Sequence, residues 1–234
     1  MITDKRIIAV VGHYGSGKTE FSVSLVHSLA MGGMKKLAIC DLDIANPYFR
    51  SRERKQQLND LGIAVYGSHY GTEITAELPA IDAGIKAPLE DKETTVVVDV
   101  GGDDSGARIM HQFMKYFRSD DCELICIVNK NRPETSTLEG AENHIRRIEA
   151  ETGLTITGIV SNAHFIRYTT AQDVIDGWEF TSKLCERLGK PLLAVTAPEH
   201  LTEEVKALRD KAGAEFELFT IGMFMRESWL DKKV

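Results

Sequence analysis

A phosphate-binding loop is the part of this sequence with the clearest capacity for chemistry. Residues 12–19 follow the pattern G-x-x-x-x-G-K-[ST], in which backbone amides surround a polyphosphate. Lys18 would reach the β- and γ-phosphates, and the Thr19 hydroxyl would bind Mg²⁺. A β-branched run at 7–11 precedes the loop and a helical pattern follows it, so a nucleoside triphosphate is the expected ligand. The residues of this stretch expected to bind the nucleotide are Gly12, His13, Tyr14, Gly15, Ser16, Gly17, Lys18, Thr19 and Glu20.

Acidic residues at the ends of two apolar runs could complete a magnesium site. Asp41 and Asp43 follow the run 36–40. Two carboxylates so spaced beside a phosphate loop suit Mg²⁺-dependent phosphoryl transfer, because one holds a magnesium-bound water and the other orients the attacking water. Asp99 ends the run 95–98 and would meet the Mg²⁺ shell directly or through water. The metal ligands expected from these patterns are Thr19, Asp41 and Asp99.

Two glycines follow the last of these acids. At Gly101 and Gly102 a bare backbone can approach a γ-phosphate and respond to its loss. Residues 101–107 are therefore a candidate switch segment, and Gly102 is expected to contact the nucleotide.

Apolar runs typical of buried strands alternate with helical patterns along the chain. Strands are expected at 6–11, 36–41, 63–66, 94–100, 122–129, 154–161 and 191–196, with an eighth near 216–221 left open. Helices are expected at about 18–32, 50–60, 74–86, 104–117, 136–151, 170–189 and 202–211. The pairs Ser136/Glu139 and Thr170/Asp173 read as capping boxes. This order predicts a three-layer α/β fold with a mostly parallel, doubly wound sheet of about seven or eight strands.

The composition limits the classes of function. Hydrophobic residues make up 43% of the chain and charged residues 27%, as in a globular protein, and one nucleotide-binding domain over 1–234 is expected. The net charge of −7 argues against a nucleic-acid-binding face. No apolar run approaches the roughly 20 residues of a membrane span. Because the N-terminus leads straight into the first strand, no signal peptide is expected and a cytoplasmic location is predicted.

The order of the glycine-rich loop, Asp41-x-Asp43 and Asp99-x-Gly101-Gly102 resembles the P-loop ATPases of the MinD/ParA/CobQ/CobB type. That superfamily includes the nitrogenase iron protein and dethiobiotin synthetase. The resemblance covers the nucleotide-binding framework across most of the chain. It implies that Asp43 positions the hydrolytic water, so that Lys18 and Asp43 are the catalytic pair, and that Asp41 supports Mg²⁺.

The resemblance also implies a dimer formed face to face over the nucleotide. MinD-like loops carry a lysine just after the first glycine that reaches the partner's nucleotide, and this chain has His13 there. Histidine is shorter and only partly charged at pH 7, so the bridge would be weaker. A homodimer is therefore expected to be insensitive to nucleotide.

The residues after the fifth and sixth strands favour adenine over guanine. The segment Asn129-Lys130-Asn131-Arg132 resembles a guanine-reading motif, but that motif needs a carboxylate at its fourth position, and Arg132 is a donor. Asn129, Arg132 and Asn162 are expected near the base. ATP and Mg²⁺ are thus the predicted cofactors.

Three functions remain open from the sequence. The first is an ATPase whose switch loops act on a protein partner. The second is a synthetase or kinase that transfers the γ-phosphoryl to a small molecule, with a pocket lined by His69, Tyr70 and Arg108. The third is a nucleotide-binding scaffold with negligible turnover, against which Asp43 speaks. The identity of the partner or substrate stays open.

Overall fold

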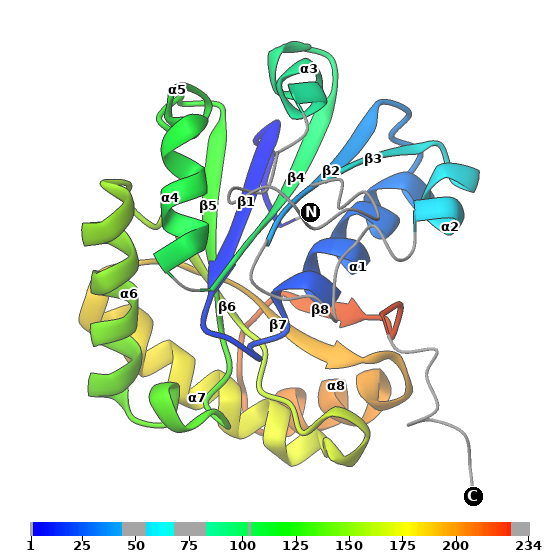
Figure 1. The fold of residues 1–234 in the computed structure, drawn as a ribbon. Helices are drawn as coiled ribbons and strands as arrows, with labels where there is room; N and C mark the ends of the chain where they lie inside the picture. Colours follow the sequence, from blue (N-terminus) through cyan, green and yellow to red (C-terminus); the bar gives the residue numbers. More distant parts are fainter. Residues whose placement is uncertain (1, 44–54, 68–82, 103, 226–234) are drawn as a thin grey trace, which may run out of the picture.

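The computed structural model describes residues 2–43, 55–67, 83–102 and 104–225 (Figure 1). Its centre is an eight-stranded sheet with the order β3-β2-β4-β1-β5-β6-β7-β8, in which every neighbouring pair is parallel. The strands are β1 (Ile7–Gly12), β2 (Leu37–Leu42), β3 (Ile63–Gly67), β4 (Thr95–Val100), β5 (Cys122–Val128), β6 (Gly158–Ser161), β7 (Leu192–Pro198) and β8 (Leu218–Ile221). This confirms the three-layer, parallel α/β fold and shows that the eighth strand, expected near 216–221, is present as β8.

Helices cover both faces of the sheet. They are α1 (Lys18–Met31), α2 (Lys55–Asp60), α3 (Lys86–Glu90), α4 (Asp104–Gln112), α5 (Met114–Phe117), α6 (Leu138–Thr152), α7 (Ala171–Leu188) and α8 (Thr202–Lys211). Short 3₁₀ turns lie at η2 (Ala83–Ile85), η3 (Pro133–Thr135), η4 (Ile166–Tyr168) and η5 (Glu199–Leu201). In Figure 1, α4 to α6 lie on one side of the sheet and α1 on the other. Among the described residues, no helix is long and apolar enough to cross a membrane.

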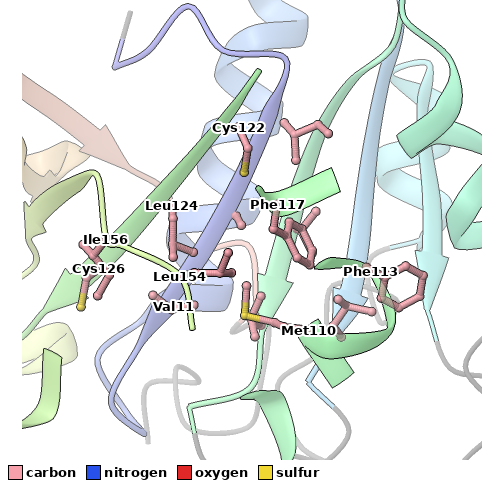
Figure 2. Close-up of a cluster of buried hydrophobic side chains, with 14 of the residues drawn as sticks. Val11, Met110, Phe113, Phe117, Cys122, Leu124, Cys126, Leu154 and Ile156 are labelled. Carbon is pink, nitrogen blue, oxygen red and sulfur yellow. The ribbon is translucent and has the colours of Figure 1, made fainter. Parts of the chain in front are cut away.

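Two hydrophobic cores explain why the strands read as unbroken apolar runs. Ile7, Ala9 and Val11 of β1 pack under α4 to α6, while Ile8 and Val10 pack under α1. A parallel sheet covered on both faces buries every residue of its central strands, so alternation with polar residues disappears. Figure 2 shows the first of these cores, where aromatic rings of the α4–α5 region meet side chains of β1 and β5.

The helix expected over 104–117 is divided at Phe113. The Phe113 backbone leaves helical values (φ −118°, ψ 13°), and its ring stays buried in the core of Figure 2. The second piece, α5, directs the Tyr116 hydroxyl to the Glu90 carboxylate at 2.6 Å. Tertiary contacts thus override a helical pattern in the sequence.

The strand expected over 154–161 begins only at Gly158. The reason lies in side-chain acceptors that bind the preceding backbone amides. The Leu154 amide donates to the Thr152 hydroxyl, and the Ile156 amide donates to the Glu149 carboxylate. Both apolar side chains stay buried, but their amides are no longer available to a strand ladder.

One of the two expected capping boxes is wrong. Thr137 is the N-cap of α6, where its hydroxyl accepts from the Gly140 amide, and Ser136 instead donates to the Pro133 carbonyl. The Thr170/Asp173 box at the start of α7 is confirmed. The helices expected at 50–60 and 74–86 lie partly outside the described residues, which contain α2 from Lys55 and α3 after the turn η2.

All four cysteines are buried, and none of them forms a disulfide bond. Burial raises the pKa of the Cys122, Cys126 and Cys185 thiols to about 12, because a thiolate would lose its hydration in the core. These thiols are therefore protonated and unreactive in the folded protein.

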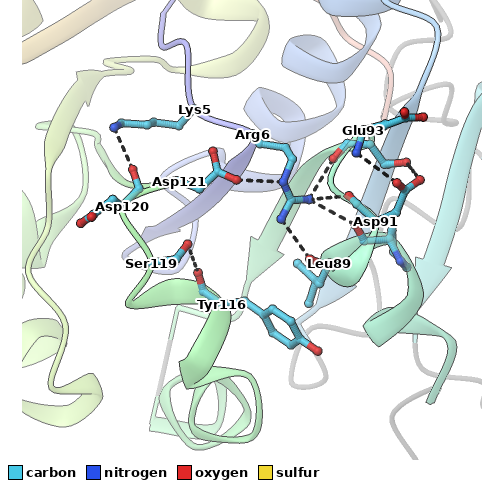
Figure 3. A network of polar contacts seen from close by, with 11 residues as sticks. Lys5, Arg6, Leu89, Asp91, Glu93, Tyr116, Ser119, Asp120 and Asp121 are labelled. Carbon is cyan, nitrogen blue, oxygen red and sulfur yellow. Dashed lines mark hydrogen bonds and ion pairs between the residues drawn. The ribbon is translucent and has the colours of Figure 1, made fainter.

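Arg6 clamps the end of the sheet that lies away from the phosphate loop (Figure 3). Its guanidinium donates to the Asp121 carboxylate at 2.9 Å and to backbone carbonyls of α3 and the α3–β4 connection. Two of these carbonyls, Pro88 and Leu89, lie in the last turn of α3, and the other two, Asp91 and Thr94, lie between α3 and β4. One side chain thus holds the entry to β4 against the entry to β5.

Arg6→Ala should lower the free energy of unfolding by about 2–4 kcal/mol, because it leaves partly buried acceptors without their charged donor. Urea unfolding of the purified protein measures this change. Lys5→Ala is the matched control, since the Lys5 side chain makes a single exposed hydrogen bond, to the Asp120 carbonyl. The control should change stability by no more than about 0.5 kcal/mol. Equal effects of the two variants would contradict the clamp.

Candidate functional site

The phosphate loop connects β1 to α1 and has the backbone shape that its glycines permit. Gly12, Gly15 and Gly17 have φ values of 147°, 73° and 88°, a region that side chains disfavour. Gly17 is the N-cap of α1, so the loop ends at the positive end of the helix dipole. The Ser16 hydroxyl is buried, and no described residue forms a hydrogen bond with it. This orphaned polar atom fits a loop whose partner is a ligand.

Lys18 folds back over the loop that precedes it. Its ammonium donates to the His13 carbonyl at 3.3 Å, and the side chain is almost fully buried. The backbone of Gly102 lies directly above, because a Cβ placed there would stand 2.8 Å from the Lys18 nitrogen and 2.6 Å from the Gly12 oxygen. The start of the candidate switch segment therefore touches the phosphate loop, and only glycine fits that approach.

Asp99 is joined to the first turn of α1 by two hydroxyls. Thr19 donates to one carboxylate oxygen at 2.6 Å, and Ser22 lies 3.4 Å from the other. The pKa of Asp99 is raised to about 6, chiefly by burial and to a smaller degree by the nearby Asp43, while the Thr19 hydrogen bond and Lys18 oppose the rise. A buried carboxylate whose charged form is disfavoured in this way gains from a nearby cation.

The two aspartates after β2 lie beside this pair. In the sheet register Asp41 is directly opposite Asp99 on β4, and one Asp41 oxygen accepts from the Asp43 amide at 3.0 Å. Asp43 lines the cleft described next. The structure thus brings together Thr19, Asp41, Asp43 and Asp99 as the sequence predicted, while their roles toward a metal stay predictions.

A cleft of about 350 Å³ runs from the phosphate loop along the carboxyl ends of β6, β7 and β8. This volume is within the range of small-molecule sites. Its phosphate end is lined by Tyr14, Gly15, Gly17, Lys18, Thr19, Glu20, Asp43 and Arg132. Its other end is lined by Asn162, Ala163, His164, Ile166, Thr169, Thr196, Pro198, Ile221, Gly222, Met223 and Met225.

The residues expected near a base divide into lining and supporting groups. Arg132 lines the cleft and donates from Nε to the Gly15 carbonyl at 2.8 Å. Asn162 also lines it, and its amide donates to the Ser16 carbonyl at 2.6 Å while accepting from Thr196. Asn129 is fully buried beneath them and accepts from the Asn131 amide. Arg132 and Asn162 therefore fix the loop from two sides.

His13 is directed toward α6. Its ring packs edge-on against His144 with centroids 5.2 Å apart, and its Nε2 lies 3.7 Å from the Glu134 carboxylate. Burial lowers the pKa of His144 to about 4, so that ring is neutral near pH 7. A phosphate contact from His13 stays a prediction, and it would require the ring to turn.

Sequence reasoning missed most of the far end of the cleft. Ile166, Met223 and Met225 come from loops after β6 and β8 that carry no motif. Ile166 has a φ of 61°, and among the non-glycine residues that the structure describes it alone has a positive φ. Such strain in a β-branched residue costs about 1–3 kcal/mol and tends to mark ligand sites. No residue pattern signals this conformation in advance.

Part of the predicted substrate pocket cannot be placed. His69 and Tyr70 lie outside the described residues. Arg108 belongs to α4, but its side chain is not among those described.

No protein-family model matches this chain, and no curated protein matches it by sequence. Solved structures do match. Chloroplast FtsY from Physcomitrella patens has a TM-score of 0.54 and 16% identity, over 81% of this chain and 57% of that one. The cell division protein FtsY from Thermotoga maritima has a TM-score of 0.49 and 21% identity, over 80% and 60%. The signal recognition particle 54 kDa protein from Aeropyrum pernix K1, solved with GDP, has a TM-score of 0.49 and 18% identity, over 82% of this chain and 41% of that one.

This chain spans between 41% and 60% of the length of these three proteins. At such low identity the match to chloroplast FtsY shows a shared fold alone. The chain therefore has the three-layer fold of P-loop nucleotide-binding proteins, while the narrower resemblance to MinD/ParA-type ATPases stays a prediction.

Proposed function

We propose that this protein is a Mg²⁺-dependent ATPase whose switch segment acts on a partner. The observation that carries the proposal is the joining of a complete phosphate loop to Asp99 through the Thr19 hydroxyl, with Asp43 facing the same cleft. A scaffold without turnover would need the loop but would not need Asp43 there. We also propose the cytoplasmic location that the sequence predicts.

The donors around Thr19 suit magnesium. Hydroxyl and carboxylate oxygens are the ligands that Mg²⁺ prefers, and it usually takes one or two from protein with the rest from phosphates and water. In the described part of the chain, no three His, Cys, Asp or Glu side chains gather to hold a metal alone, which agrees with such a shared shell. Thr19 and Asp99 would hold the ion with support from Asp41, which lies opposite Asp99 in the sheet, and the ion would neutralise charge on the β- and γ-phosphates.

The chain's own residues would then perform three tasks. Lys18 leaves the His13 carbonyl and binds the phosphate oxygens, where its charge stabilises the transition state. Asp43 accepts a hydrogen bond from the attacking water and holds it in line. Gly102, which already touches the loop and Lys18, would move when the γ-phosphate departs.

Adenine suits the cleft better than guanine. Guanine is read by a carboxylate that accepts from its N1–H and N2–H₂ groups. Among the described lining residues the acids are Asp43, at the phosphate end, and Glu20, which accepts from the Phe224 and Met225 amides. The far end instead offers the apolar side chains of Ile166, Met223 and Met225, and thioethers pack well on aromatic rings.

Transfer of the γ-phosphoryl to a small molecule is the competing proposal. The segment expected to bind such a substrate lies outside the described residues. Hydrolysis rates measured against a panel of carboxylates and alcohols separate the two, because an acceptor substrate would raise turnover and become phosphorylated.

Asp43→Asn should keep Mg²⁺-ATP binding and lower turnover by roughly 10²-fold or more, since the attacking water loses its orienting base. Lys18→Ala should lose binding itself. Calorimetry and phosphate release measure the two quantities. The exposed Glu139→Gln variant is the control and should match the parent protein. Normal turnover by Asp43→Asn would show that another group orients the water.

ATP should bind at least tenfold more tightly than GTP, about 1.4 kcal/mol, in competition experiments with Mg²⁺. Inosine triphosphate tests the reason, because it shares the guanine oxygen and N1–H but lacks the 2-amino group. We expect it to bind as weakly as GTP. Equal or tighter binding of GTP would reject adenine recognition.

The mass in solution should be the same in the apo, ADP and ATP states. His13 packs against His144 and offers no permanent charge to a second subunit's phosphates. Light scattering on the Asp43→Asn variant, which should hold ATP unhydrolysed, measures this. A shift from monomer to dimer with ATP alone would instead restore a MinD-type switch.

A further inference from the structure

One face of α1 is bound to a segment about two hundred residues later in the chain. Glu20, Ser24 and His27 are spaced four and three residues apart, so they share that face. Opposite them lies the segment 222–225, which follows β8 and is called the strap here.

The strap is held through its backbone. Both oxygens of the Glu20 carboxylate accept from consecutive amides, with Oε1 bound to Phe224 and Oε2 at 3.1 Å from the Met225 nitrogen. The buried Ser24 hydroxyl accepts from the Gly222 amide at 3.0 Å. The ring of Phe224 rests on His27 with centroids 4.7 Å apart. Three backbone donors of a loop thus end on two side chains of one helix.

The other side of the strap lines the nucleotide cleft. Gly222, Met223 and Met225 belong to the far end of the cleft, where the base is expected. Met225 is buried, whereas Met223 is 45% exposed at the mouth. The strap is therefore a wall of the base pocket, and α1 supports it from behind.

An acidic residue in the first turn of this helix needs a physical reason. The N-terminus of α1 is where the phosphates are expected, and a carboxylate lining the same cleft would repel them. Two amides of the strap bind the Glu20 charge and so disperse it. The repulsion between the Glu20 carboxylate and the phosphates is offset by the two hydrogen bonds with which this carboxylate fixes the strap.

We propose that Glu20 and Ser24 are positioning residues for nucleobase recognition, which act by fixing the strap as the wall of the base pocket. This rests on the proposed nucleotide site. Because α1 starts at the phosphate loop, the same helix sets the position of the phosphates and of the base wall. Base selectivity then depends on residues that need not touch the base.

The test compares two ligands that share phosphates and differ in the base. Binding of Mg²⁺-ATP and of Mg²⁺-tripolyphosphate is measured for the parent protein, Glu20→Gln and Ser24→Ala. Glu20→Gln keeps one acceptor but turns an amide donor toward the second strap N–H. We expect ATP to bind about tenfold more weakly to each variant and the preference for ATP over GTP to fall. Tripolyphosphate binding should be unchanged in Ser24→Ala, and equal or tighter in Glu20→Gln, which removes a negative charge near the phosphates.

The controls keep a folding defect distinct from positioning. Ser28→Ala changes an exposed serine on the same helix, and Glu139→Gln changes an exposed acid in the first turn of α6, so both should bind ATP as the parent does. A parallel loss of ATP and tripolyphosphate would overturn the proposal, as would unchanged ATP binding in both variants. If the parent protein binds neither ligand, the proposed nucleotide site itself fails, which is a separate result.

Discussion

The hydrogen bond from the Thr19 hydroxyl to Asp99 is the contact on which the site depends. It joins the helix after β1 to the end of β4, and it exists because β4 lies between β1 and β2 in the sheet. The register places Val10 opposite Asp99, and Asp41 opposite Asp99 on the other side. A slip of one residue would turn Asp99 to the opposite face of the sheet. Strand order and register therefore decide the chemistry as much as the loop does.

The parts that could be predicted from the sequence are those with local causes. The phosphate loop is a short motif whose glycines dictate its shape, and the apolar runs around Ile8 and Val97 stay unbroken because both faces of the sheet are covered. The parts that could not be predicted depend on contacts distant in sequence. Thr152 and Glu149 delay the start of β6 by binding amides, and Glu20 reaches a segment 204 residues away.

The two ends of the cleft accordingly differ in construction. The phosphate end is one continuous stretch from β1 into α1, with Arg132 and Asn162 bracing its carbonyls. The far end is assembled from separate loops, one of which carries the strained backbone of Ile166. Strain of this kind persists only where the surroundings enforce it, here through Thr169, whose hydroxyl donates to the Ile166 carbonyl. We therefore expect substitutions to be tolerated less at the first end than at the second.

Oxidation of the four buried cysteines would report local unfolding of the protein. A thiol reacts only as an exposed thiolate, and each of these sulfurs is enclosed by core side chains. Cys40 directly precedes Asp41 on β2, while Cys185 lies on α7, so the sulfurs sample different layers of the molecule. The order in which they become modified under mild oxidation would map which layers separate first. Oxidised thiols recovered from a cell would mark molecules that had opened there.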